Sequence, residues 1–251
     1  NLATAWDHHR AWVSAQRKCL GLLQTPTLKA RGRASDAQIG MQPPTVRLEH
    51  IALDHGARFD VRAQPGERIA LVGTHASGKT RLLELIAGLR SPAHGRVRLD
   101  DFAPGALTLA QRRRTIGFVS PRSPLLAGSL RRALTMGLKS RPADEAIVDA
   151  AQRFGLQPLL SRLGGLDGSV AENGRNLSSG ELRRLLLARG FLAAPRLLLL
   201  DDLDAALGPD APALIDRLTG TLGATTLVAT QDLAVARDMD TIWFIDDGCV
   251  V

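Results

Sequence analysis

The sequence is poor in aromatic residues and in cysteine. It contains no tyrosine, and phenylalanine and tryptophan together make up 4% of its 251 residues. Its basic clusters, such as 112–114 and 183–184, contain no interleaved aromatic residues, which argues against a surface that stacks nucleic-acid bases. The only cysteines, Cys19 and Cys249, stand near opposite ends of the chain. No disulfide framework is expected, and a reducing, cytosolic setting is favoured.

Long hydrophobic runs are also missing. No stretch reaches the roughly 18 apolar residues needed to span a bilayer, and the most apolar region, 185–200, is interrupted by Arg189, Pro195 and Arg196. Residues 1–20 carry charges throughout, so no signal peptide is expected. Any membrane role must come from a partner or from a segment outside this chain. A start at Asn1 rather than Met suggests a piece of a longer protein.

The composition is otherwise that of a globular protein. Hydrophobic residues make up 45% of the chain, enough for the core of one compact domain or of two closely joined subdomains. The net charge is +7, and arginine supplies most of the positive side chains. Because the arginine pairs and triplets are scattered along the chain, we assign them to solvated helix faces rather than to a nucleic-acid interface.

The chain divides into three parts. Residues 4–23 place Trp6, Val13 and Leu20 at helical spacing, which predicts an amphipathic helix over 1–24. Residues 25–45 concentrate proline, glycine and basic side chains, and we predict a linker there. The remaining residues are predicted to form the globular domain, over 46–251.

Within that domain, predicted strands alternate with predicted helices. This alternation indicates an α/β fold with a mostly parallel sheet. The predicted strands cover 46–48, 59–61, 68–72, 116–119, 197–200, 226–229 and 242–247, the last leading into a hairpin turn at Asp247-Gly248. The predicted helices cover 80–89, most of 129–163, and 181–192.

A phosphate-binding loop is indicated by the spacing G-x-x-x-x-G-K-[ST], which follows an apolar strand and opens a helix. Glycines let the backbone curl so that N–H groups point at phosphate oxygens, and the helix N-terminus adds positive potential. Lys79 would contact the β- and γ-phosphates of a nucleotide, and the Thr80 hydroxyl would bind Mg²⁺. The predicted nucleotide-binding residues are Gly73, Thr74, His75, Ala76, Ser77, Gly78, Lys79 and Thr80.

Two further segments carry candidate site residues. The apolar strand 197–200 ends in Asp201 and Asp202. Asp201 would complete a Mg²⁺ site, although two carboxylates could also simply terminate a core strand.

Ser178 and Glu181 fit a capping box at the start of the predicted helix 181–192. The same serine, glycine and helix N-terminus could instead be offered to a phosphate, and local chemistry favours neither interpretation.

Taken in this order, the three segments resemble those of the ABC transporter ATPases, and the resemblance covers 46–251. Leu177–Glu181 is similar to the family signature LSGGQ. Residues 116–134 resemble the Q-loop segment of exporter-type members, and 169–174 resemble their short acidic loop. Residues 4–23 are similar to the cytoplasmic end of the last transmembrane helix of such exporters.

The resemblance implies a fold, a location and partners. The fold would be a P-loop NTPase with a RecA-like core, an N-terminal antiparallel β part and a helical subdomain over about 122–190. Residues 1–24 would be the end of a missing membrane domain. The chain would bind ATP with Mg²⁺ at the cytoplasmic face of the cell membrane and couple ATP hydrolysis to export. It would pair with a second ABC domain and contact a transmembrane domain, with no nucleic acid as partner.

The resemblance also implies the roles of single residues. Asp202 occupies the position of the catalytic glutamate, and Gln231 replaces the histidine that contacts the γ-phosphate. With no tyrosine in the chain, His55 falls at about the position of the adenine-stacking aromatic residue. The signature residues would contact ATP held by the partner domain; they are Leu177, Ser178, Ser179, Gly180 and Glu181.

Several family positions are altered, mostly on the side that binds this chain's own nucleotide. Together the changes imply slow hydrolysis there, whereas binding, which depends mainly on the phosphate loop and Asp201, would survive. Such an asymmetry fits one half of a heterodimeric exporter. The altered positions are Ala76 for a third loop glycine, Pro121 for the Q-loop glutamine, Asp202 for glutamate, Gly208 for aspartate, and Gln231 for histidine.

Three other functions fit the same residues. A homodimeric exporter ATPase would use Asp202 as a weak base. A soluble ABC protein acting on nucleic acid would show salt-sensitive DNA or RNA binding, and the exporter-like segments argue against it. A pure interaction module would have lost ATP binding altogether.

Overall fold

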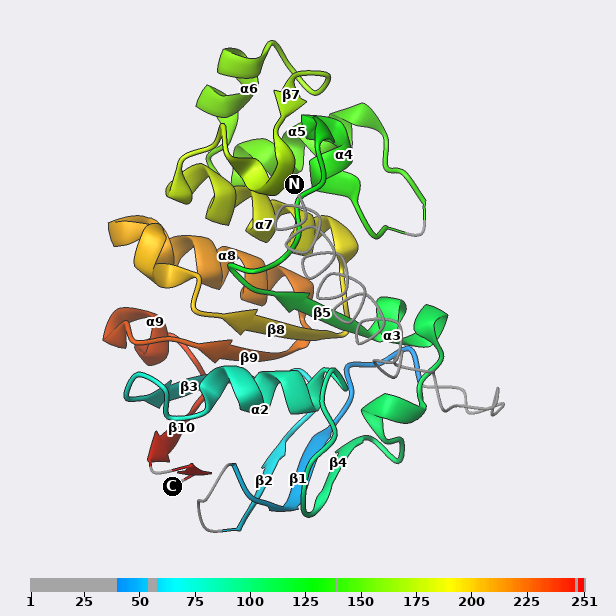
Figure 1. Cartoon of the computed structure of the whole chain (residues 1–251), viewed down its shortest axis with the longest axis vertical. Helices are drawn as coiled ribbons and strands as arrows, with labels where there is room; N and C mark the ends of the chain where they lie inside the picture. Colours follow the sequence, from blue (N-terminus) through cyan, green and yellow to red (C-terminus); the bar gives the residue numbers. More distant parts are fainter. Residues whose placement is uncertain (1–39, 54–57, 139, 247, 251) are drawn as a thin grey trace, which may run out of the picture.

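A computed structural model describes residues 40–53, 58–138, 140–246 and 248–250 (Figure 1). The predicted helix over 1–24, the linker up to residue 39, and His55 lie outside the described residues. No helix in the described ranges is long and apolar enough to cross a membrane.

The main sheet has the strand order β11-β10-β3-β9-β8-β5 in the described part of the chain. Its strands are parallel, except that β11 runs antiparallel to β10 in the predicted hairpin. The α/β prediction with a mostly parallel sheet is therefore confirmed. The strands are β3 (Arg68–Gly73), β5 (Ile116–Val119), β8 (Leu197–Asp201), β9 (Thr225–Ala229), β10 (Thr241–Asp246) and β11 (Cys249–Val250).

The central strands are buried along their whole length because other elements cover both faces of the sheet. Every residue of β8 and of β9 is buried. Leu197 and Leu199 belong to one core, shared with α2 (Lys79–Ile86), whereas Leu198 and Leu200 belong to a second core, shared with α7 (Ser179–Ala193) and α8 (Ala211–Leu222). The alternation along one strand thus divides the hydrophobic side chains between two cores.

A three-stranded antiparallel sheet packs over α2 and confirms the predicted N-terminal β part. Its order is β2-β1-β4, and its inward side chains share the α2 core. Helix α2 ends three residues before the predicted Leu89, because Gly88, at φ +68°, takes the left-handed conformation that closes a helix. The strands are β1 (Val46–Ile51), β2 (Phe59–Ala63) and β4 (Arg96–Leu99).

A group of helices lies at the far end of the molecule from the antiparallel sheet (Figure 1). The predicted helical stretch 129–163 divides into three helices around Phe154, whose side chain is fully buried. The division of the chain into domains remains a prediction. The helices are α4 (Leu130–Thr135), α5 (Asp144–Arg153) and α6 (Gln157–Leu163), next to α7 and the short pair β6 (Gly128–Ser129) and β7 (Ser169–Val170).

Shorter elements join these layers. Two α-helices, α3 (Leu109–Thr115) and α9 (Leu233–Arg237), precede β5 and β10. The 3₁₀ helices are η1 (Pro104–Ala106), η2 (Glu172–Gly174), η3 (Asp204–Ala206) and η4 (Gly208–Asp210). Both η3 and η4 follow the acidic end of β8. The carboxyl end of this strand is therefore followed by short 3₁₀ turns.

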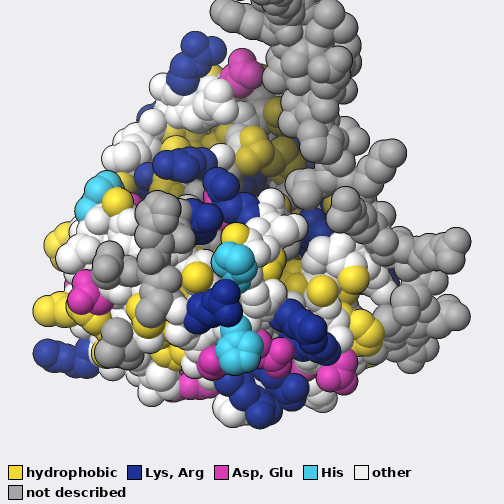
Figure 2. Space-filling view, turned by 60° about the horizontal axis from the view of Figure 1, so that its bottom comes forward, with side chains coloured by type: hydrophobic (Ala, Val, Ile, Leu, Met, Phe, Trp, Pro, Cys, Tyr) yellow, Lys and Arg dark blue, Asp and Glu magenta, His cyan; other side chains and the backbone are white. Residues whose placement is uncertain are grey.

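Many arginines on the helical surface form ion pairs. Arg131 contacts Asp144 and Asp167, and Arg184 contacts Asp210. On the face shown in Figure 2, Lys and Arg side chains occur in separate groups, and those at the lower edge are interspersed with Asp and Glu. This distribution is that of solvated, paired surface charge rather than of one continuous basic stripe.

Candidate functional site

The predicted phosphate-binding loop joins a strand to a helix, as the sequence indicated. It runs from Gly73, the last residue of β3, to Lys79, the first residue of α2. A Cβ atom at Gly73 would lie 2.3 Å from the Ile245 carbonyl oxygen and 2.8 Å from Ser77 Oγ, so only glycine fits between β10 and the loop. The loop therefore curls tightly over the N-terminus of α2, as the sequence spacing requires.

Ala76 departs from the family pattern, and its backbone conformation shows how the substitution raises the energy of the loop. Its φ is +62°, in the left-handed region that glycine enters freely. A residue with a Cβ atom pays about 1–2 kcal/mol for that conformation. Ala76 is exposed, so the cost is in the backbone rather than in crowding by neighbours.

Lys79 lies folded over its own loop. Its Nζ donates to the carbonyl oxygens of Gly73 at 2.8 Å and Thr74 at 2.7 Å, and to Ser77 Oγ at 3.4 Å. The residue is only 8% exposed. Burial lowers the pKa of Lys79, and the nearby carboxylates Asp202 and Asp201 oppose this effect. The ammonium group is therefore a partly desolvated cation at the centre of the phosphate loop.

Thr80 and Asp201 meet although 121 residues separate them. Thr80 Oγ1 donates to Asp201 Oδ1 at 2.8 Å, and Ser120 Oγ donates to Asp201 Oδ2 at 3.5 Å. The sequence analysis assigned both residues to one Mg²⁺ site, and that assignment remains a prediction. A hydroxyl beside a carboxylate provides hard oxygen donors that fit Mg²⁺, which takes few protein ligands and keeps several waters.

Asp201 is 5% exposed, and its burial raises the pKa of its carboxyl group. A carboxyl with a raised pKa in the folded state binds more protons there than in the unfolded state. Stability therefore falls as pH rises from the unfolded-state pKa through the folded-state pKa. At neutral pH the metal-free domain thus carries a destabilising charge.

We expect Asp201→Asn to raise the melting temperature at pH 7 without metal by about 2–4 °C, which corresponds to about 1 kcal/mol in a domain of this size. Thermal unfolding from pH 4 to pH 8 should show that the gain shrinks as pH falls, because protonation neutralises Asp201 in the wild type. The exposed Asp101→Asn variant is the matched control. A lower melting temperature at pH 7 would mean that the hydrogen bonds to the carboxylate outweigh its desolvation.

Asp202 and Gln231 lie at the carboxyl ends of the neighbouring strands β8 and β9. Both residues are exposed, and neither side chain makes a hydrogen bond within the described residues. The backbone of Asp202 has φ +48° and donates its N–H to the Ala229 carbonyl at 3.1 Å. The two side chains are therefore near the phosphate loop in the fold but are not held in place by each other.

The helix after Leu177 begins with the predicted capping box. Ser178 Oγ accepts from the N–H of Glu181 at 3.2 Å, and Glu181 Oε2 accepts from the N–H of Ser178 at 2.8 Å. Arg162 adds a contact to Glu181 Oε1 at 2.9 Å. The capping interpretation is confirmed, whereas the binding of phosphate by Ser178, Ser179 and Gly180 remains a prediction.

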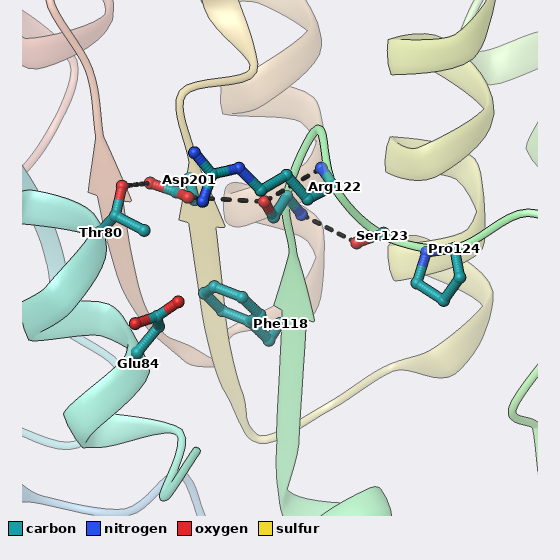
Figure 3. A pocket seen from close by; sticks show the side chains of 8 residues that line it. Thr80, Glu84, Phe118, Arg122, Ser123, Pro124 and Asp201 are labelled. Atoms are coloured by element: carbon teal, nitrogen blue, oxygen red, sulfur yellow. Dashed lines mark hydrogen bonds between the residues drawn. The ribbon is translucent and has the colours of Figure 1, made fainter. Parts of the chain in front are cut away.

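A cavity of about 280 Å³ opens beside Asp201 (Figure 3). Thr80 and Glu84 line it from α2, and Phe118 lines it from β5. Pro121, the residue at the predicted Q-loop position, does not line it, but its neighbour Arg122 does. The complete lining is Thr80, Glu84, Phe118, Ser120, Arg122, Ser123, Pro124 and Asp201.

The phosphate loop, the acidic strand end and the capped signature-like helix thus form one arrangement on a parallel sheet. Residues 57–205, more than half of the chain, match the family described as ABC transporter. The chain belongs to this family. The predicted membership is confirmed, and the fold class is that of the ABC P-loop NTPases.

Similar ABC proteins are longer than this chain. A multidrug efflux ATP-binding/permease protein of Mycobacterium bovis is 35% identical over 198 residues, covering 78% of this chain and 16% of that protein. The mycobactin import ATP-binding/permease protein IrtB of Mycolicibacterium thermoresistibile is 35% identical over 261 residues, covering 100% of this chain and 44% of that protein. The chain therefore spans less than half of the length of either relative.

A solved ABC structure confirms the fold. The structure of a bacterial Atm1-family ABC exporter with ATP bound superposes with a TM-score of 0.76 and is 24% identical in sequence. The match covers 85% of this chain and 39% of that chain. At this identity the likeness supports the fold alone.

Asp204 is a site residue of this ABC domain that the sequence analysis missed. It is 6% exposed, and its Oδ2 accepts from Thr230 Oγ1 and from the N–H groups of Gln231 and Asp232, both at 3.3 Å. Its Oδ1 is buried with no hydrogen-bond partner in the described part of the chain. Asp204 therefore fixes the backbone that carries Gln231. The sequence showed a third aspartate shortly after Asp202, but the hydrogen-bond partners of Asp204 lie 26–28 residues away, so no local pattern indicated its role.

Ser120 and Arg122 were also missed. From the sequence, only Pro121 between them was singled out, because it has no polar side chain at the Q-loop position. The structure places Ser120 on Asp201 and Arg122 in the cavity wall. A serine and an arginine in a turn have no distinctive spacing, so the sequence offered no signal that they lie beside Asp201.

Proposed function

We propose that this chain binds Mg-ATP at 73–80 and couples ATP-driven pairing with a second ABC domain to transport by a membrane exporter. The observation that carries the proposal is the 2.8 Å contact from Thr80 Oγ1 to Asp201 Oδ1. It joins the phosphate loop to the acidic strand end at one point, as a site for a metal-bound triphosphate requires. The names of the two relatives, both ATP-binding/permease proteins, support the transport role.

Binding would use groups that already face the loop. Lys79 Nζ would exchange the carbonyl oxygens of Gly73 and Thr74 for β- and γ-phosphate oxygens. A phosphate is the better partner for a partly desolvated ammonium because its negative charge adds a Coulombic attraction that a neutral carbonyl oxygen does not provide. Mg²⁺, held by Thr80 and Asp201, would supply charge neutralisation between the phosphates.

Hydrolysis at this chain's own site is proposed to be slow. Asp202 has a carboxylate one C–C bond shorter than glutamate, and a misplacement of about 1 Å can cost about 10²-fold in rate. Gln231 can donate from its amide but cannot carry the positive charge of a histidine. Pro121 has no side-chain polar group to orient water or metal. These residues act on one transition state, so their losses do not simply add.

The signature segment is proposed to serve a partner. Ser178 and Ser179 are exposed at the start of α7, a helix of 15 residues whose N-terminus provides positive potential. In a head-to-tail pair this segment would complete the ATP site of the second ABC domain. We place the assembly at the cytoplasmic face of the cell membrane, in contact with a transmembrane domain and without nucleic acid.

Mixing this chain with a hydrolysis-competent ABC partner tests the arrangement. Ser178→Ala in this chain should lower the ATPase rate of the pair at least about tenfold, since losing one transition-state hydrogen-bond donor can cost about 10²-fold or more. ATP binding by this chain itself should not change. Ser91→Ala, at an exposed serine far along the chain from the signature, is the control. An unaltered ATPase rate in the Ser178→Ala pair would contradict the shared-site arrangement.

A further inference from the structure

The cavity beside Asp201 contains a positive side chain that the proposed function does not yet use. Figure 3 shows the Arg122 side chain running from the loop after β5 toward Asp201. Both residues line the same cavity as Thr80. The shared cavity and the direction of the Arg122 side chain therefore place a guanidinium beside Asp201, at the end of the site where the proposed Mg²⁺ would lie.

The turn that carries Arg122 is tied to Asp201 by hydrogen bonds. Ser120 Oγ donates to Asp201 Oδ2 at 3.5 Å and accepts from the N–H of Arg122 at 3.3 Å. Ser123 Oγ accepts from the N–H of Ser120 at 3.1 Å. Hydrogen bonds through Ser120 thus link the backbone of Arg122 to Asp201. The Cα atom of Arg122 is therefore held close to the phosphate loop.

The guanidinium forms no ion pair within the part of the chain that the structure describes. Among the described residues, no carboxylate lies within ion-pair distance of Arg122. The other carboxylate of the cavity, Glu84, is already engaged by Arg90. Arg122 is exposed and can therefore turn toward an incoming anion without breaking an ion pair.

We propose that Arg122 is a built-in cation that binds the triphosphate at the metal end of this site and makes nucleotide binding less dependent on Mg²⁺. The inference rests on the proposed ATP binding and deepens it. Guanidinium groups bind phosphate oxygens through two parallel N–H donors. Because like charges repel at short range, Arg122 also weakens the attraction of the Asp201 region for Mg²⁺. The residue thus compensates for Pro121, which offers the metal no ligand.

The test is ATP affinity, measured by calorimetry on the full chain in excess Mg²⁺ and again in excess EDTA. The wild type should bind in both, with a difference below about tenfold. Arg122→Gln should lose at least about tenfold in EDTA, equivalent to about 1.4 kcal/mol, and much less in Mg²⁺. Arg122→Lys, which keeps the charge without the two-donor fork, should lie between them.

The control is Arg132→Gln, at an exposed arginine on α4 that makes no ion pair with any described residue. Its affinities should match the wild type under both conditions. If Arg122→Gln and the wild type have equal affinity in EDTA, the Arg122 inference is overturned while the proposed function stands. If the wild type binds ATP in neither condition, the proposed function itself fails and the inference fails with it.

Discussion

Replacing Lys79 with alanine should remove ATP binding from this chain, with an affinity loss of at least about 10²-fold. The physical reason is that Lys79 is the one cation inside the loop itself, and it is 8% exposed. Its Nζ already reaches two loop carbonyls at 2.7–2.8 Å, where phosphate oxygens would replace them. Each hydrogen bond between charged groups contributes about 1.5–3 kcal/mol, so two such bonds account for the expected loss.

Calorimetric titration with Mg-ATP measures the loss directly. Arg113→Ala, which removes an exposed positive charge from α3, is the control and should leave the affinity unchanged. The folded state should survive Lys79→Ala, because burial lowers the pKa of the lysine and its charge is already unfavourable without a ligand. A melting temperature close to that of the wild type therefore has to accompany the loss. Equal ATP affinity in both proteins would rule out 73–80 as the phosphate site.

Restoring the two altered catalytic positions together should raise this chain's own ATPase rate by about 10²-fold. Glutamate at position 202 would extend the carboxylate, and histidine at position 231 would contact the γ-phosphate. Asp204 already fixes the backbone on which position 231 sits, through Thr230 Oγ1 and two N–H groups. The new histidine would therefore start from an ordered loop. The expected gain of about 10²-fold equals the loss of rate that a displacement of about 1 Å can cause.

Steady-state ATPase assays should compare Asp202→Glu, Gln231→His and the double variant with the wild type. Each single change should have little effect, because the base and the phosphate contact act on the same transition state. Asp101→Glu, the same chemical change at an exposed site, is the control. Rapid hydrolysis by the unmodified chain would falsify the slow-site proposal and favour a homodimeric ATPase that uses Asp202 as its base.

The reliable sequence predictions concerned features formed by neighbouring residues. The capping box of Ser178 and Glu181 spans four residues, and its two hydrogen bonds are both present. The apolar run 197–200 predicted a strand buried on both faces, and β8 is one. Spacing alone also placed the phosphate loop between β3 and α2. Each of these features depends on hydrogen bonds or burial within one segment of the chain. A local sequence pattern is therefore enough to predict it.

The contacts that complete the site join residues far apart in the chain. The need for glycine at position 73 comes from the Ile245 carbonyl, and the role of Asp204 comes from Thr230. The place of Arg122 depends on the strand order β3-β9-β8-β5, in which β3 and β5 follow one another along the chain but are separated by β9 and β8. The sequence by itself thus determined the family, the phosphate loop and the strand and helix types. Only the tertiary structure decided which side chains surround Asp201, because that depends on how the strands are ordered in the sheet.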